Sequence, residues 1–203
     1  MRSHTASDLP GRCRRCWIRD AFCICADVPR VETQTRVLFV RHERESFKST
    51  GTVRIANLAL PNSEIVDFGE EAAPANERLS ALVAGAVLVF PAEPPQPWPT
   101  APVEKVILLD GTWRQTRRMF HRLPALHSLP RLTLPPKDAQ VLRLRESTFA
   151  DGRSTMEAAA DALERLESPE KAEQLHRLHA LYVERVFRAR GVWEMKRSQL
   201  AGA

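Results

Sequence analysis

Short runs of apolar residues alternate along the chain with longer segments in which apolar residues recur every three or four positions. The short runs predict strands at 36–40, 63–67, 86–90 and 105–109, with 141–144 as a further candidate. The periodic segments predict helices at 51–60, 76–83, 113–122, 154–166 and 169–190. The helix at 154–166 carries its own start signal, because Ser154 and Glu157 have the spacing of a capping box.

Strands that alternate with helices predict an α/β fold with a mostly parallel sheet and helices on both of its faces. Ligands of such sheets bind beyond the carboxyl ends of the strands. Three strand ends are therefore candidates: Phe90-Pro91, Leu109-Asp110 and the stretch after Leu144. The chain has neither a Gly-x-Gly-x-x-Gly turn nor a P-loop, which argues against a standard dinucleotide-binding fold and against a P-loop nucleotide site.

The organisation along the chain predicts three parts. Residues 1–10 are polar and are expected to be disordered, and residues 11–30 form a cysteine-rich segment with few apolar residues. Residues 31–203 have the patterning and length of one compact catalytic domain. Within it, the proline-rich stretch at 91–102 is expected to be a loop.

Composition narrows the class of protein. Hydrophobic residues make up 43% and charged residues 27% of the 203 residues, which is ordinary for a globular protein. The sequence has no apolar run long enough for a membrane span and no apolar leader near its start, so we expect a cytoplasmic protein without a membrane partner. The formal charge of +5 favours polyanionic partners. The alternative explanation is that the many arginines behind this charge result from a GC-rich genome.

All four cysteines lie in the pattern Cys13-x2-Cys16-x6-Cys23-x-Cys25. Four thiolates satisfy tetrahedral Zn²⁺, and a site saturated with sulfur is structural because it leaves no open position for water. The second pair is unusually tight, so the alternative is a cluster of free thiols. Clustering of this kind in a reducing compartment favours metal over disulfides.

The end of the strand at 105–109 is the second candidate site. The strand places Asp110 at the carboxyl edge of the sheet, where Gly111 permits a tight turn and Thr112 caps the next helix. A carboxylate at this edge accepts a proton or orients a nucleophile; a capping role alone is the alternative. Trp113 either joins the core or stacks on a base or an adenine ring.

A basic face follows on the helix at 113–122. Spacings of three and four residues place on one broad face Arg114, Arg117, Arg118, His121 and Arg122. A solvated helical face is one interpretation. The other is an RNA-binding track, because arginines without an intervening acid repel one another until phosphate neutralises them. Arginines of the cysteine segment would extend the track: Arg12, Arg14, Arg15 and Arg19.

The segment Asp110-Gly111-Thr112-Trp113-Arg114-Gln115 resembles the signature of the DTW-domain family of tRNA-uridine aminocarboxypropyltransferases. Glu43 stands where the family pattern has proline, and Gly51 stands where it has asparagine. The further segments that resemble the family, in the same order along the chain, are the cysteine cluster, His42-Glu43-Arg44-Glu45, Gly51-Thr52-Val53-Arg54-Ile55-Ala56, Leu88-Val89-Phe90-Pro91 and Ser154-Thr155-Met156-Glu157-Ala158.

The resemblance implies a SPOUT-like fold with a C-terminal trefoil knot that holds S-adenosylmethionine, and it implies tRNA as the partner. The implied reaction is attack by uridine N3 on the γ-carbon of the methionine moiety, with release of methylthioadenosine. Asp110 would be the base, with Thr112 and Trp113 beside it as catalytic residues. A base is needed because uridine N3–H is a weak acid, and burial of Asp110 behind Trp113 would raise its pKa toward usefulness.

The same resemblance assigns a cofactor site. Arg54 is expected to bind the carboxylate of the methionine moiety, and Glu157 is expected to bind its ammonium group. The first backbone amides of the helix at 154–166 are expected to bind other polar atoms of the ligand. The remaining residues expected at the cofactor are Phe90, Pro91, Leu109, Asp110, Gly111, Ser154 and Thr155.

Other possibilities stay open at this point. An RNA methyltransferase on the same fold would differ only in which carbon is aligned, and a non-catalytic zinc-containing RNA-binding module would use Asp110 merely as a cap. His176 and His179 are expected at the surface, and neither Ser147 nor Ser154 lies in a nucleophile elbow. The protein is expected to be a monomer or a homodimer.

Overall fold

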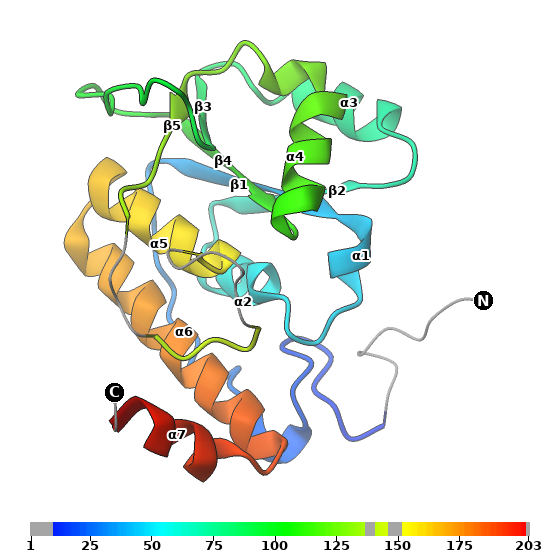
Figure 1. Ribbon diagram of the computed structural model, residues 1–203, viewed down its shortest axis with the longest axis vertical. Coiled ribbons are helices and arrows are strands. Elements are labelled where there is room, and N and C mark those ends of the chain that lie inside the picture. The colour runs from blue at the N-terminus through cyan, green and yellow to red at the C-terminus, as the bar shows by residue number, and fades with distance from the viewer. Residues whose placement is uncertain (1–9, 137–140, 146–151, 202–203) are drawn as a thin grey trace.

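The computed structural model describes residues 10–136, 141–145 and 152–201. Its centre is a five-stranded sheet with the strand order β2-β1-β4-β3-β5, in which every pairing is parallel (Figure 1). The strands are β1 (Arg36–His42), β2 (Ser63–Phe68), β3 (Ala86–Val89), β4 (Lys105–Asp110) and β5 (Arg131–Leu132). The predicted α/β fold with a parallel sheet is confirmed.

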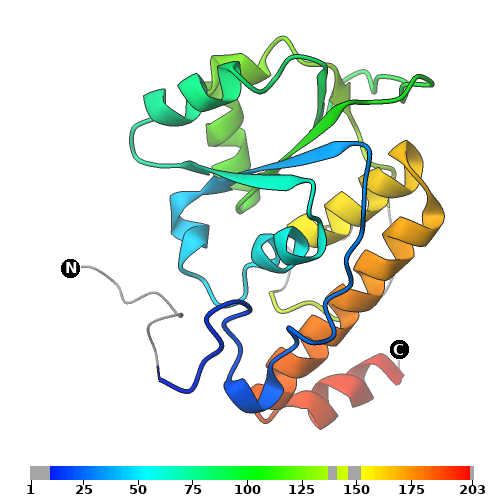
Figure 2. The ribbon, with the colours of Figure 1, turned by 180° about the vertical axis from the view of Figure 1, so that it is seen from behind.

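Helices cover both faces of the sheet, as Figures 1 and 2 show. One face packs against α2 (Thr52–Ala59) and α5 (Thr155–Leu166), and α6 (Pro169–Ala189) packs in turn against these two helices. The other face packs against α3 (Ala73–Ser80) and α4 (Trp113–Arg122). Successive side chains of a strand point to opposite faces. In β1, Val37 and Phe39 therefore join the first core, and Leu38 and Val40 join the second.

Some predicted boundaries differ from the structure. Residues 141–144 form no strand, and the fifth strand is instead β5, which is too short to carry a hydrophobic period and pairs with β3 through Leu88 and Arg131. The helix predicted at 76–83 begins at Ala73, with proline in its first turn. Two short helices were not predicted, α1 (Glu43–Ser46) and α7 (Trp193–Ala201).

The cysteine segment folds as an irregular loop with one short 3-10 helix, Asp20–Phe22, which lies against α6 (Figure 2). Its anchors Ile18 and Ile24 are buried in the core that α6 and α2 share. Of the stretch 1–10, expected to be disordered, residues 1–9 lie outside the described residues. None of the helices in the described ranges is long and apolar enough to cross a bilayer.

Candidate active site

A cavity of about 440 Å³ opens at the carboxyl ends of β3 and β4, next to the first turn of α5. Its volume falls within the range of small-molecule sites. Most of the residues predicted for chemistry or cofactor binding line it together: Phe90, Pro91, Leu109, Asp110, Gly111, Thr112, Trp113, Ser154 and Thr155. The parallel sheet brings them together because β3 and β4 end at the same edge.

Asp110 is the last residue of β4, and its side chain is buried, with 4% exposure. Oδ1 accepts a hydrogen bond of 2.5 Å from Thr155 Oγ1, whereas Oδ2 is buried without a hydrogen-bond partner among the described residues. Burial disfavours the charged carboxylate and raises the pKa of Asp110 to about 6, while the Thr155 hydrogen bond lowers the pKa. Asp110 is therefore a stronger base than a solvated aspartate and still ionises near neutral pH.

The turn after Asp110 is shaped by a capping box at the start of α4. Thr112 Oγ1 accepts from the Gln115 amide, and Gln115 Oε1 accepts from the Thr112 amide at 2.7 Å. The Gln115 side chain thus folds back over Gly111, where an added Cβ would come within 3.0 Å of Gln115 Cβ. Glycine is favoured here, because a larger residue would force the Gln115 side chain to shift.

Trp113 forms an aromatic wall beside the carboxylate. Its ring stacks on Phe90 with a centroid distance of 5.6 Å and an interplanar angle of 20°, and Phe90 stacks in turn on Phe120. Trp113 keeps 42% of its surface exposed, so it does not belong to the hydrophobic core. An exposed ring at the edge of a cavity is suited to stacking on a base.

Three arginines from the segments on either side of 146–151 also line the cavity, and sequence reasoning missed all three. Each is paired with a carboxylate on the rest of the domain: Arg143 with Glu157 at 3.0 Å, Arg145 with Glu45 at 2.9 Å and Arg153 with Asp161 at 2.6 Å. The available signal was local, since Arg143 lies within the candidate strand at 141–144 and Arg145 follows it directly, and charged side chains are unfavourable in a buried strand. Glu45 and Glu157 are each almost fully buried, so these pairs hold the segments at the cavity.

The two residues expected to clamp the methionine moiety are not among the residues that line this cavity. The Arg54 guanidinium lies 3.1 Å from the centre of the Trp17 ring and donates to the Ser46 carbonyl. Glu157 is engaged by Arg143 and by the Ser154 amide. The α5 amides are also largely occupied, because the Met156 amide donates to Thr52 Oγ1 and the Glu157 amide to Ser154 Oγ.

The histidines of α6 correct another expectation. His179 is 3% exposed rather than at the surface, and it lines the cavity with Nε2 at 3.1 Å from Ser154 Oγ and 3.8 Å from Glu157 Oε2. His176 is half-buried and lies 2.9 Å from Asp161 Oδ1. The carboxylate companions come from α5, which packs along α6, so they were not visible in the spacing of α6 itself.

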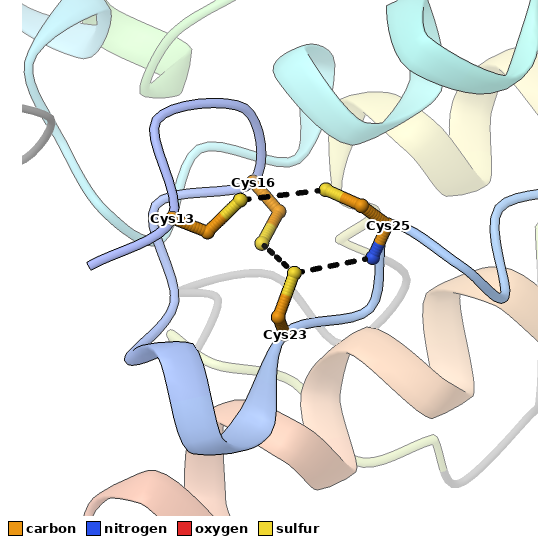
Figure 3. Close-up of side chains that lie close together, drawn as sticks. All are labelled: Cys13, Cys16, Cys23 and Cys25. Carbon is orange, nitrogen blue, oxygen red and sulfur yellow. Dashed lines mark hydrogen bonds between the residues drawn. The ribbon is translucent and has the colours of Figure 1, made fainter. Parts of the chain in front are cut away.

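The four cysteine sulfurs lie within 4.8 Å of one another (Figure 3). Cys13 Sγ is 3.5 Å from Cys25 Sγ, and Cys16 Sγ is 3.8 Å from Cys23 Sγ. Sulfurs about 2.3 Å from one tetrahedral ion are about 3.8 Å apart, so the donor set fits a single Zn²⁺. The tight Cys23-x-Cys25 spacing is therefore no obstacle to a metal site, and none of these cysteines lines the cavity.

The basic residues predicted to bind RNA divide into two groups. Exposed side chains are Arg14 and Arg15 of the cysteine segment and Arg114, Arg117 and Arg118 of α4. Arg122 is partly buried; it donates to the Glu70 carbonyl and lies 5.6 Å from the Phe68 ring, contacts that serve the fold. Trp113 and Thr116 of the same helix line the cavity, whereas none of the exposed arginines of α4 does.

Fold and cavity together define an α/β protein with a candidate ligand site at the carboxyl edge of a parallel sheet, beside the buried carboxylate of Asp110. Comparison with protein families places the chain: it belongs to the DTW domain family, whose model matches residues 11–187. The chain is similar to the tRNA-uridine aminocarboxypropyltransferase 2 of Drosophila melanogaster, with 26% identity over 177 residues that cover 78% of this chain and 68% of that protein. No solved structure matches the chain.

Proposed function

We propose that this protein modifies tRNA by transferring the 3-amino-3-carboxypropyl group of S-adenosylmethionine to N3 of a uridine. Family membership and the similarity to the Drosophila enzyme support tRNA modification. The observation that carries the chemistry is Asp110, which lies at the edge of a cavity beside an exposed tryptophan. It is a buried carboxylate with a raised pKa, and one of its oxygens has no hydrogen-bond partner within the part of the chain that the structure describes.

In the proposed step, Asp110 removes the N3 proton as N3 attacks the γ-carbon of the methionine moiety. The new N–C bond forms while the bond between that carbon and the sulfonium sulfur breaks, and the electron pair leaves with methylthioadenosine. S-Adenosylmethionine supplies a leaving group that needs no acid, so one base is sufficient. Trp113 and Phe90 would hold an aromatic ring against the cavity wall, and Thr112 would fix the turn that presents Asp110.

The methionine carboxylate would bind an arginine of the cavity wall. Arg145 suits this role better than Arg54, because Arg145 lines the cavity with 44% of its side chain exposed, whereas Arg54 is held on Trp17. Ser154 and Thr155 stay in the proposed cofactor site as lining residues. Glu157 would act through Arg143, as the acid that positions it, rather than on the ligand.

The other parts of the proposal concern metal, RNA and fold. Zn²⁺ would be held by the four cysteines as a structural ion. The tRNA phosphates would be contacted by the exposed arginines Arg14, Arg15, Arg114, Arg117 and Arg118. The protein would act in the cytoplasm as a monomer or a homodimer. A SPOUT-like fold with a C-terminal trefoil knot agrees with the parallel sheet. In the C-terminal part of the chain, residues 137–140 and 146–151 lie outside the described residues.

The test is incubation of the purified protein with S-adenosylmethionine and unmodified tRNA, followed by mass spectrometry of the nucleosides. We expect a uridine that has gained an aminocarboxypropyl group in the wild type and none in Asp110→Asn. Gain of a single methyl would show the methyltransferase alternative instead. A protein that binds tRNA but does not bind S-adenosylmethionine in calorimetric titration would be a binding module and would refute the proposal.

A further inference from the structure

A second cavity, of about 560 Å³, lies between the cysteine segment and the C-terminal end of α6. Figure 2 shows these two parts of the chain side by side at the lower end of the molecule. Four arginines and two aromatic rings line it, and its described lining includes no acidic residue: Arg12, Arg19, Arg188, Arg190, Trp17 and Phe22. A concave site with this lining favours an anionic ligand.

The arginines of this cavity differ in how they are held. Arg12 donates to the Trp17 carbonyl at 2.9 Å, and Arg188 is paired with Glu184 at 2.7 Å. Arg19 and Arg190 are exposed, and no hydrogen bond or ion pair from either side chain to another described residue is found. These two guanidiniums are therefore available to bind phosphate oxygens from solution.

The second cavity adjoins the candidate active site through consecutive residues. Ser49 lines the second cavity and Thr50 lines the first, and consecutive Cα atoms are about 3.8 Å apart. The wall between them is fixed, because the fully buried Tyr182 donates a hydrogen bond of 2.7 Å to the Ser49 carbonyl. Along α6, His179 of the first cavity and Arg190 of the second are separated by about 16 Å of helix, so a polymeric anion that enters both cavities would place more than one unit between them.

We propose that the second cavity is a subsite for the RNA backbone, in which Arg19 and Arg190 bind a phosphate a few nucleotides along the strand from the uridine held beside Asp110. This inference rests on the proposed function and deepens it, because it assigns a role to the end of α6 that the signature segments of the sequence did not indicate. Phosphate contacts of this kind set the register of an RNA without reading its sequence. The subsite would thus help to select which nucleotide enters the first cavity.

The double variant Arg19→Ala/Arg190→Ala tests the subsite, with Arg30→Ala/Arg197→Ala as a control of equal charge change. The control arginines are exposed, each is paired with a glutamate, and neither lines the cavity. We expect roughly tenfold weaker binding of unmodified tRNA, and a plot of log affinity against log salt whose slope is smaller by about two. Affinity for S-adenosylmethionine and the melting temperature should match those of the control.

Two results would overturn the subsite. One is tRNA affinity and salt slope in the double variant equal to those of the control. The other concerns inorganic phosphate, measured at constant ionic strength. If the wild type binds it and the double variant does not, while the affinity for tRNA is unchanged, the cavity is a site for a free anion. Failure of the proposed function is a separate result, since it would appear as absence of modified uridine in the wild type even if tRNA binding depends on Arg19 and Arg190.

Discussion

Thr155 Oγ1 donates a hydrogen bond of 2.5 Å to Asp110 Oδ1, although 45 positions separate the two residues in the sequence. The bond connects the first turn of α5 to the end of β4. It occupies one carboxylate oxygen and leaves Oδ2 without a hydrogen-bond partner among the described residues. Thr155 is thus a positioning residue, which sets both the orientation of the carboxylate and its charge state.

The pH dependence of turnover should reveal this role. The hydrogen bond lowers the pKa of Asp110, and burial raises it to about 6. In Thr155→Val the carboxylate loses this donor, so we expect the midpoint of the rise in rate with pH to move upward, with a loss of rate at low pH and recovery at higher pH. Thr155→Ser should restore the midpoint. Single-turnover rates across pH measure this, and a uniform loss with an unmoved midpoint would refute it.

Asp110→Asn should abolish product formation and yet stabilise the fold at neutral pH. The pKa of Asp110 is raised in the folded state, so the native protein holds this proton more tightly than the unfolded chain does. Its ionised form therefore costs stability above about pH 6, and the cost disappears as the pH falls toward the ordinary carboxyl pKa of 3.8. We expect a gain of up to about 3 kcal/mol at pH 7.5, since one pKa unit corresponds to about 1.4 kcal/mol.

Urea unfolding of both proteins at pH 7.5 and at pH 5 measures this gain. The difference in the free energy of unfolding should narrow at the lower pH, because asparagine has no proton to release. Asparagine also keeps an oxygen that accepts from Thr155. An Asp110→Asn protein less stable than the wild type at pH 7.5 would show that the charge is not a burden on the fold.

Removal of zinc should weaken the fold more than the chemistry. The cysteine segment holds Ile18 and Ile24 in the core, and Trp17 supports Arg54, but no cysteine lines the first cavity. We therefore expect a chelator to lower the melting temperature while turnover persists at temperatures well below the new transition. About one zinc per chain should be found by elemental analysis, and Cys16→Ser should reproduce the effect of the chelator. Loss of turnover in a protein that is still folded would contradict a purely structural ion.

The strands and the position of Asp110 could be predicted because their signals are local. Continuous apolar runs identify buried strands, and the residue that follows such a run lies at the carboxyl edge of a parallel sheet. The cysteine spacing likewise indicated four sulfur ligands, and the structure brings these sulfurs together. In each case the residues concerned are close in the sequence.

The missed parts of the site depend on pairings between distant segments. Arg145 pairs with Glu45 across 100 positions, and His179 is buried because α5 places Ser154 and Glu157 against it. The spacing of residues within α6 is the same whether a histidine packs against the polar start of α5 or faces solvent, so the sequence pattern could not distinguish the two. The contact of Arg54 with Trp17 could not be predicted for the same reason, because Trp17 lies in a segment whose irregular fold the sequence pattern does not predict.

The exposed arginines of α4 should bind RNA without affecting the cofactor. Arg117 and Arg118 are both exposed and neither lines the cavity, whereas their neighbour Thr116 does. We expect Arg117→Glu/Arg118→Glu to weaken tRNA binding and to reduce its salt slope by about two, with unchanged affinity for S-adenosylmethionine. Arg177→Glu/Arg197→Glu is a control of equal charge change, because both arginines are exposed, each is paired with a glutamate of its own helix, and neither lines the cavity. Arg122→Ala should instead lower the stability of the fold more than the affinity for RNA, because Arg122 contacts Glu70 and Phe68. Equal salt slopes for the wild type and the α4 double variant would mean that this face is only solvated.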